Sequence, residues 1–487
     1  MMRKVSVCAG VAAAMVAFSA AAEESRSVGG QAASTEQTAE PTPAGEGQGA
    51  VAAPAMEQGP SAPPLVDAAV GGAVSTAPAA EPATVAQAKA EAPASAEAPE
   101  VHIPFSLTLV PGLSTAGLHT GNVVNTVSIG LVATHAKRVE GVAMAIGGNW
   151  VEDRLSGAQL SVGANISRGA VTGAQLTVGG NVAGGDVLGL QSSVGVNVVR
   201  GAMEGAQLTV GANAVTGPVN GAQLSVGANI ATGAVLGAQI GVGANVAAGP
   251  VRGLQAAVGL NVAPEMSGLQ MSSGVSYARH LKGGQLSIIN VGGEVDGAQV
   301  GLVNIAGKVD GAQVGLVNVA GHTEGEAVGL LSFVGNGQAH LQVWSSDISL
   351  TNVGVKLGGR HIYTLLAAGF TPPLDGERRH WTLGAGIGGH IPLGRFYVDM
   401  DVMGSTLHER RLYDETEHIL GQFRVLAGWQ VARRFAVFGG ISANTLVTWD
   451  DSDRWEELGI GPEWREVSDG GRTVFRMWPG IQAGIQL

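Results

Sequence analysis

The sequence predicts an all-β protein: a glycine-rich β-solenoid repeat array, followed by a C-terminal antiparallel β-barrel-like domain and preceded by a disordered linker. Three observations support this fold class. Repeats of 14 to 16 residues fill positions 127–340. Apolar and polar residues alternate with a period of two within each repeat, which is the side-chain period of a β-strand. From residue 341 the repeats end, but the alternation continues, and 16 of the 21 aromatic residues lie there.

The first 22 residues are typical of a secretory signal peptide. Arg3 and Lys4 precede an apolar run, and Ala20 and Ala22 supply the small residues of a cleavage site. Cys8, the only cysteine of the chain, lies inside this segment. We therefore expect a mature chain without disulfides and without a cysteine-based metal site or nucleophile.

Residues 23–100 are expected to be a disordered linker rich in Ala, Pro and Glu. This stretch holds half of the chain's 20 prolines and no aromatic residue, so it cannot bury enough apolar surface to offset its conformational entropy. It also carries most of the net charge of −12. Because the acidity belongs to a tail and no basic face is evident, we expect no nucleic-acid partner.

A lead-in strand segment at 101–126 precedes the array. The repeats open with glycine and carry a Gln at the third position and an Asn five or six residues later, as in GAQLSVGANISRGAVT and GAQVGLVNIAGKVD. They start at Gly157, Gly173, Gly189, Gly205, Gly221, Gly237, Gly253, Gly268, Gly283, Gly297 and Gly311, with weaker copies on both sides. Units this short cannot fold alone, but stacked coils can pair their backbones, and atypical end copies can cap the stack.

Each repeat has two sets of alternating side chains. Leu160, Val162 and Ile166 belong to one set, and Gln159 and Asn165 belong to the other. Equivalent Gln and Asn residues of successive coils would lie about 4.8 Å apart and form amide ladders. Glycines at the start of each unit and in the connectors are expected to take positive φ values at sharp reversals of the chain.

The C-terminal region, 341–487, is expected to form an antiparallel barrel. Its alternating runs of about 9–11 residues, with aromatics near their ends, are typical of outer-membrane strands. FSLTLV (105–110) is a candidate for an eighth strand, which would close a small barrel filled by side chains. We expect Asp399 and Asp401 to pair with Arg424 inside it. The seven candidate strands lie near 350–357, 361–370, 381–391, 395–404, 420–431, 434–448 and 473–487.

The repeats resemble a bacterial surface-repeat family, in which glycine-led Gln…Asn repeats follow a signal peptide. This resemblance covers roughly 125–340 and implies a surface or outer-membrane location without an established activity. The Q-x-G-x-x-N-x-A phrase from Gln299 to Ala306, repeated from Gln313 to Ala320, is also similar to curli subunits, although Gly293 and Asp310 stand where those carry Ser and Gln. Residues 341–487 look like outer-membrane β-barrel proteins in general, which usually end in an aromatic residue where this chain has Leu487.

Few residues suggest chemistry. GAGIGG (384–389) has the spacing of a nucleotide-binding loop, but its flanks continue a strand pattern, so we expect the glycines to make room in a curved sheet. HERR (408–411) and DETEH (414–418) are interpreted as a polar loop. The acidic loop 450–457 could hold calcium, but a solvated loop is the simpler interpretation. We predict no catalytic, cofactor-binding or metal-binding residues.

The sequence thus favours a non-enzymatic structural or adhesive repeat protein of the bacterial surface or outer membrane. The outer membrane is the expected partner of the C-terminal domain, and the periplasm is an alternative location. Two other functions remain open. One is a larger transport-like barrel in which the repeats are membrane strands, and the other is a curli-like fibre subunit.

Overall fold

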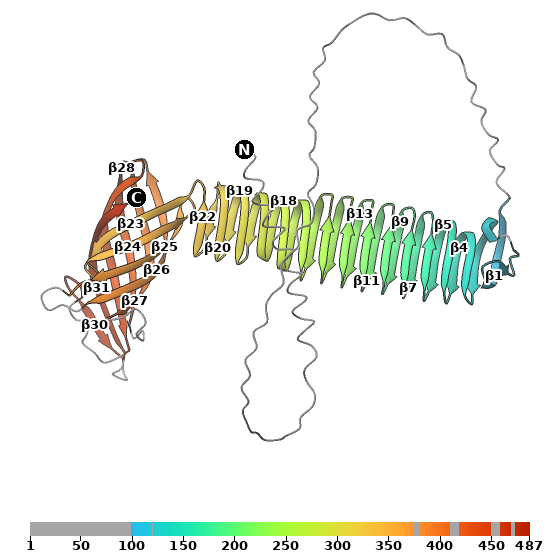
Figure 1. Ribbon diagram of the computed structural model, residues 1–487, viewed down its shortest axis with the longest axis horizontal. Coiled ribbons are helices and arrows are strands. Elements are labelled where there is room, and N and C mark those ends of the chain that lie inside the picture. Colours follow the sequence, from blue (N-terminus) through green and yellow to red (C-terminus); the bar gives the residue numbers. More distant parts are fainter. Residues whose placement is uncertain (1–98, 119, 374–378, 410–417, 450–457, 469–472) are drawn as a thin grey trace, which may run out of the picture. The chain divides into compact units, whose positions relative to one another are not determined.

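The computed structural model describes residues 99–487 except 119, 374–378, 410–417, 450–457 and 469–472. The expected fold class is confirmed: the chain forms a β-solenoid of about 13 turns and a closed 8-stranded antiparallel β-barrel (Figure 1). The predicted signal peptide and nearly all of the predicted linker lie outside the described residues. No described helix is long and apolar enough to span a membrane.

The solenoid begins at residue 101, so the lead-in segment is already part of it. Its first turns are β1 (Val101–Val110), β2 (Leu113–Ser114), a short 3-10 helix (Thr120–Asn122), β3 (Val123–Gly130), β4 (Ala133–Ala145) and β5 (Gly148–Ser161). The regular turns are β6 (Ala164–Ser167), β7 (Val171–Thr177), β8 (Gly180–Ala183), β9 (Val187–Ser193), β10 (Val196–Val199), β11 (Met203–Thr209), β12 (Ala212–Val215), β13 (Val219–Ser225), β14 (Ala228–Ala231), β15 (Val235–Gly241), β16 (Ala244–Ala247) and β17 (Val251–Ala257). The last turns are β18 (Leu260–Val300), β19 (Val303–Val314), β20 (Val317–Thr323), β21 (Glu326–Val328) and β22 (Leu331–Val334).

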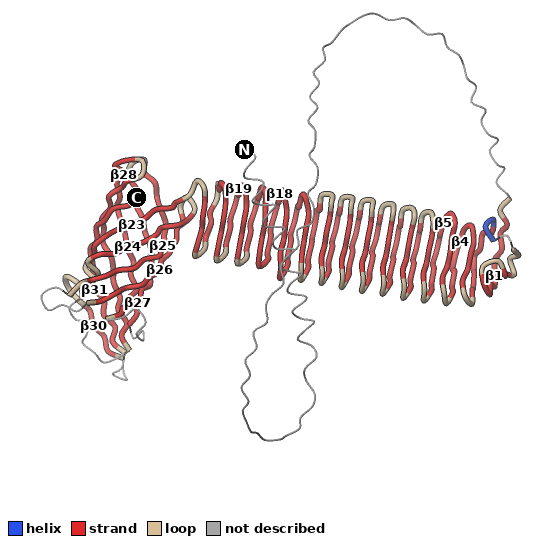
Figure 2. The backbone as a smooth tube through the Cα atoms, in the orientation of Figure 1, coloured by secondary structure: helices blue, strands red, loops and turns tan. Residues whose placement is uncertain are grey.

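Each regular coil has two strands joined by bends, and every strand pairs in parallel with its equivalent in the next coil. β7 pairs with β9 so that Gly173 lies opposite Gly189 and Gln175 opposite Gln191. The same register of like on like continues through the stack, and Figure 2 shows it as regularly repeated strands and turns. Parallel pairing with a constant offset requires coils of nearly constant length, which explains the repetition in the sequence.

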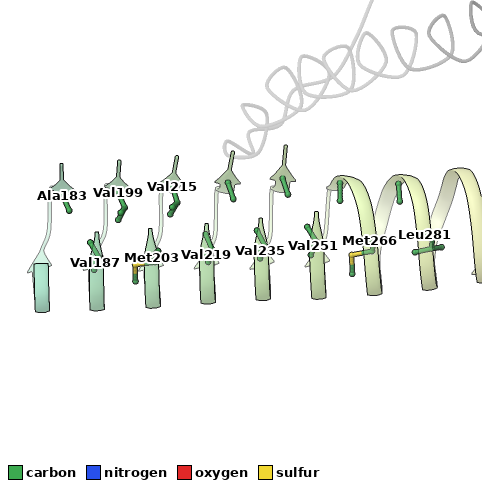
Figure 3. Close-up of a cluster of buried hydrophobic side chains, with 14 of the residues drawn as sticks. Ala183, Val187, Val199, Met203, Val215, Val219, Val235, Val251, Met266 and Leu281 are labelled. Carbon is green, nitrogen blue, oxygen red and sulfur yellow. The ribbon is translucent and has the colours of Figure 1, made fainter. Parts of the chain in front are cut away.

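Half of the space between the two strand layers is filled by aliphatic side chains. One row comes from the longer strands and includes Val187, Met203 and Val219, and the facing row includes Ala183 and Val199 (Figure 3). These side chains are at most 1% exposed. Their burial supplies the hydrophobic part of the coil-to-coil stability.

The other half of the interior is filled by the predicted amide ladders. Gln175 Nε2 donates to Gln159 Oε1 at 2.7 Å, and Asn165 Nδ2 donates to Asn181 Oδ1 at 3.0 Å. Asn165 also donates to the backbone carbonyl of Leu176 at 2.8 Å. The Gln and Asn side chains are 0% exposed, so the amide set faces inward and the Leu160 set faces outward. Sequence alternation had separated the two sets without saying which one is inside.

The leading glycines are required for two reasons. Gly205 has φ of 128°, and a Cβ on it would lie 2.1 Å from the carbonyl oxygen of Gly189 in the preceding coil. These glycines lie within strands, so the prediction that they form reversals is wrong. The connector glycines reverse the chain without positive φ. For Gly217 the constraint is spatial, because its Cβ would lie 2.4 Å from the carbonyl oxygen of Gly201.

The barrel follows directly after the solenoid. It consists of β23 (Gln338–Ser346), β24 (Thr351–Gly358), β25 (Ile362–Thr371), β26 (His380–Leu393), β27 (Phe396–His408), β28 (His418–Ala432), β29 (Phe435–Thr448) and β31 (Val474–Gln486), with β30 (Trp464–Val467) paired to β31. Pairing of β23 with β31 closes the ring. All seven predicted strands are present.

The predicted eighth strand was wrong. Residues 105–110 belong to β1, which pairs in parallel with β3 in the solenoid, and β23 supplies the eighth strand of the barrel instead. The array and the barrel form two separate sheets. No repeat is a strand of the barrel, so the larger barrel built from repeats is excluded.

Gly205→Ala is expected to destabilise the solenoid by about 2 kcal/mol or more, because alanine is strained at this φ and its Cβ meets backbone. Gly180→Ala is the matched control, since other repeats carry alanine at this position and Gly180 has no positive φ. Urea unfolding followed by circular dichroism measures both. Equal losses would show that the leading glycine has no special role.

Gln207→Glu is expected to destabilise the protein at neutral pH by about 3 kcal/mol or more, because it buries a charge within the ladder. Burial raises the folded-state pKa of the new carboxyl above its unfolded value of about 4.3. The deficit relative to the wild type should therefore be small at acidic pH and grow as pH rises. Asn220→Asp, at an exposed position of the same repeat, is the control. Thermal melts of the wild type and both variants across pH measure the effect. A loss of stability of Gln207→Glu that did not depend on pH would contradict the ladder.

Candidate functional site

The barrel wall is apolar on its outer face. The outward positions of β27, for example, are Phe396, Val398, Met400 and Val402, and no outward position of β23, β27, β28, β29 or β31 carries Asp, Glu, Lys or Arg. The large exposed apolar side chains of the strands are Leu341, Val353, Val355, Leu383, Ile387, Ile391, Leu393, Phe396, Met400, Val402, Ile419, Phe423, Trp429, Val431, Val437, Ile441, Phe475, Met477, Ile481 and Ile485. Such a wall is unfavourable in water.

Aromatic side chains flank this wall at both ends. At one end the rings of Phe396 and Trp429 stack with centroids 6.3 Å apart, and at the other the rings of Phe370 and Trp381 lie 4.2 Å apart. Each pair joins directly opposed residues of neighbouring strands. Aromatic residues at both borders of an apolar band are also a feature of membrane barrels, and here each border carries one such pair.

The barrel interior is filled. One apolar layer consists of Trp344, Tyr363, Leu365, Met403, Leu426 and Phe438, and a second consists of Ile348, Leu407, Leu420, Leu446 and Trp478. Buried charged side chains lie beside the first layer. The interior of this barrel is therefore a packed core, as eight strands lead one to expect.

Arg424 and Asp401 form the centre of the charged cluster. Arg424 Nε donates to Asp401 Oδ1 at 2.6 Å, and its Nη2 donates to Asp401 Oδ2 at 3.0 Å. Tyr363 donates its hydroxyl proton to Asp401 Oδ2 at 2.7 Å. Both members of the pair are about 1–2% exposed. The predicted pairing of these residues is confirmed, and it follows from their direct opposition on β27 and β28.

The prediction that Asp399 also pairs with Arg424 is wrong. Asp399 instead accepts from Lys356 Nζ at 2.6 Å and contacts His390 Nδ1 at 2.7 Å. The Lys356 ammonium also lies 3.9 Å from the centroid of the Tyr363 ring. Sequence reasoning missed Lys356, although its place among outward Val353 and Val355 signals an inward cation. Two cations thus balance two carboxylates in the cluster.

The GAGIGG segment is part of β26, as its flanks indicated. Gly388 lies against the charged cluster: a Cβ there would lie 2.5 Å from the Asp401 Cβ and 2.6 Å from the Tyr363 ring. Gly428 serves the same purpose beside Tyr397. These glycines leave room for the interior side chains, and nothing in this context provides a phosphate-binding loop.

The two ends of the barrel differ. At one end the strands are joined by short turns at 359–361, 394–395 and 433–434. At the other end residues 347–350 join β23 to β24, and longer stretches of sequence separate β25 from β26, β27 from β28, and β29 from β31. The solenoid enters at the short-turn end, where Gln338 pairs with Gly358. Glu326 of the last coil accepts from the backbone nitrogen of His361 in the first of these turns and from that of Ile362 at the start of β25.

The remaining candidates from the sequence lie mostly outside the described residues. The acidic loop 450–457 does so entirely, and so do residues 410–411 of HERR and 414–417 of DETEH, whereas His408 ends β27 and His418 begins β28. Within the described part of the chain, no group of three or more His, Asp or Glu side chains is arranged to hold a metal ion.

Comparison of the chain with protein-family models, with curated proteins and with solved structures finds no match.

Arg424→Ala should destabilise the barrel by about 3–5 kcal/mol, because Asp401 would remain buried without its cation. Arg395→Ala, in an exposed short turn, is the control and should be nearly neutral. Heat-dependent gel migration and urea unfolding in detergent measure the effect. An unchanged unfolding midpoint for Arg424→Ala would contradict the role of this pair.

Proposed function

We propose that this chain is a structural protein of a Gram-negative-type bacterium, anchored in the outer membrane by its barrel and carrying its solenoid as a rigid repeat domain. The observation that carries the proposal is the polarity of the barrel. Lys356, Asp399, Asp401 and Arg424 are buried inside, whereas the outer wall is aliphatic and aromatic. A lipid environment favours this arrangement, because it solvates the wall and leaves the charges to pair internally.

The barrel is better suited to anchoring than to transport. Two apolar layers and a charged cluster occupy its interior, which is unfavourable for a water-filled path. Closure also removes the exposed edges that an open sheet would present to lipid. The proposed role of the barrel is therefore to hold the solenoid at the membrane.

The proposed side for the solenoid is the periplasm. Membrane barrels of bacteria place short turns on the periplasmic side and long loops outside. The solenoid joins the barrel at its short-turn end. This supports the periplasmic alternative over an adhesive rod on the cell surface, and it makes the long-loop end the part that faces outward.

Both ends of the solenoid oppose growth into a fibre. At the first coil, β2 folds back antiparallel to β1, and Pro104 within β1 lacks an N–H for further pairing. At the last coil, the turn between β24 and β25 bonds to Glu326. A curli-like subunit needs open edges at both ends, so we favour a single membrane-attached solenoid.

Labelling of single cysteines in a Cys8→Ala background tests the proposed side. Thr232→Cys, on an exposed bend of the solenoid, should react with a membrane-impermeant maleimide only after the outer membrane is permeabilised. Ser468→Cys, in the long segment between β30 and β31, should react on intact cells.

Each outcome of this experiment is informative. Reaction of Thr232→Cys on intact cells would place the solenoid outside and overturn the periplasmic assignment. Recovery of the folded chain in the soluble fraction, with no heat-dependent gel migration, would overturn the membrane anchor itself.

A further inference from the structure

The solenoid has one predominantly aliphatic edge along its length. Counted from the leading glycine, the fourth and sixth residues of each repeat point outward around the bend between the two strands. In the repeat that begins at Gly205 these are Leu208 and Val210, which are 39% and 54% exposed. In the repeat that begins at Gly268 the sixth residue is Ser273. The other sixth-position residues, at 43–57% exposure, are Val162, Val178, Val194, Val210, Val226, Val242, Val258, Ile288, Leu302, Leu316 and Leu330.

Charged side chains of the repeats are confined to the other side. None of the eleven repeats that start at Gly157 through Gly311 carries Asp, Glu, Lys or Arg in its first eleven residues. All their charges occur later, at the opposite bend and the residues that follow it: Arg168, Asp186, Arg200, Glu204, Arg252, Glu265, Arg279, Lys282, Glu294, Asp296, Lys308, Asp310 and Glu324. The solenoid is therefore amphipathic along its length.

The interior does not explain this edge. The space directly behind it is filled by the Gln and Asn ladders, such as Gln207 and Asn213, whose side chains are 0% exposed. Aliphatic residues thus face outward where amides face inward, which is the polarity already found in the barrel. Ordinary water-exposed solenoids have no reason to keep an edge that is aliphatic apart from Ser192 and Ser273 over this many coils.

We propose that the aliphatic edge of the solenoid lies in the acyl-chain boundary of a lipid leaflet, with the charged side toward water. This inference rests in part on the proposed membrane anchor, which would hold the solenoid beside lipid. An amphipathic element with an apolar face and a charged opposite face is suited to this position in the interface.

The shape of the edge favours lipid over a second copy of the chain. Val210 and its equivalents lie at a bend, so the edge is convex, and two convex edges touch along a narrow line. Protein interfaces need closely complementary surfaces, whereas acyl chains adapt to a ridge. The edge also lacks aromatic and Arg side chains, which are enriched where proteins bind proteins.

The test uses the full chain with Cys8→Ala, refolded into vesicles of phosphatidylcholine alone. Single cysteines at Val242 and Ala248 carry a polarity-sensitive fluorophore. Both are exposed residues of one repeat, Val242 on the aliphatic edge and Ala248 on the opposite bend. Ile441→Cys, on the outer wall of the barrel, reports insertion of the barrel. Nitroxide-labelled lipid serves as the quencher.

The probe at Val242 should be quenched about twofold or more strongly than the probe at Ala248. A triple variant, Val194→Glu, Val210→Glu and Val226→Glu, should reduce quenching at Val242, because three charges would enter the apolar boundary. These positions are half-exposed at bends, and circular dichroism checks that the solenoid remains folded.

Three outcomes would overturn the inference. The probe at Val242 could remain in water while Ile441 is quenched, which would leave the membrane anchor intact. Val242 and Ala248 could be quenched equally, which would deny any role to the edge. The probe at Val242 could be shielded from water without being quenched by labelled lipid, and the cysteine at this position could cross-link two chains. That result would show that a second copy of the chain covers the aliphatic edge. Lack of quenching at Ile441 counts against the anchor alone, and Val242 still decides the inference.

Discussion

The architecture of the solenoid depends on how closely successive coils stack. At each leading glycine, the carbonyl oxygen of the preceding coil occupies the place where a Cβ would be, about 2 Å from that position. Coils this close must place like on like, because any shift in register would bring a side chain against this backbone. Strand length, bend position and the alignment of the interior amides all follow from this one contact.

Both parts of the chain bury polar side chains beside their apolar core, and each meets the cost of burying them differently. In the solenoid, every buried Gln and Asn of the regular repeats has a partner in the neighbouring coil, so few amide groups lose hydrogen bonds on burial. In the barrel, paired cations and carboxylates share hydrogen bonds with Tyr363 and His390. These buried polar groups are thus largely satisfied within each part, and the outer surface is left to interact with an apolar environment.

Much of the fold could be predicted from the sequence, because repetition and alternation are local signals. The repeat boundaries, the amide ladders and seven barrel strands came directly from spacing. Alternation could not show which face of the solenoid strands is inside, because it separates two sets of side chains without showing which set is buried. Burial of the Gln set is also the less usual outcome. β23 was missed because its inward residues include Trp344 as well as Gln342, which weakens a polar-in, apolar-out pattern. Lys356 was missed as a partner of Asp399 because it lies on β24 and Asp399 lies on β27, so their contact crosses the barrel interior and does not follow from the pairing of adjacent strands.

The two amide ladders have opposite polarity. Gln residues donate toward the preceding coil, as Gln175 does to Gln159, whereas Asn residues donate toward the following coil, as Asn165 does to Asn181. Their dipoles therefore oppose one another along the axis, and added coils do not accumulate an electrical imbalance between the ends. Duplication or deletion of gene segments can lengthen or shorten such an array by one repeat at a time. In each resulting array the dipoles of the Gln ladder and the Asn ladder still oppose one another.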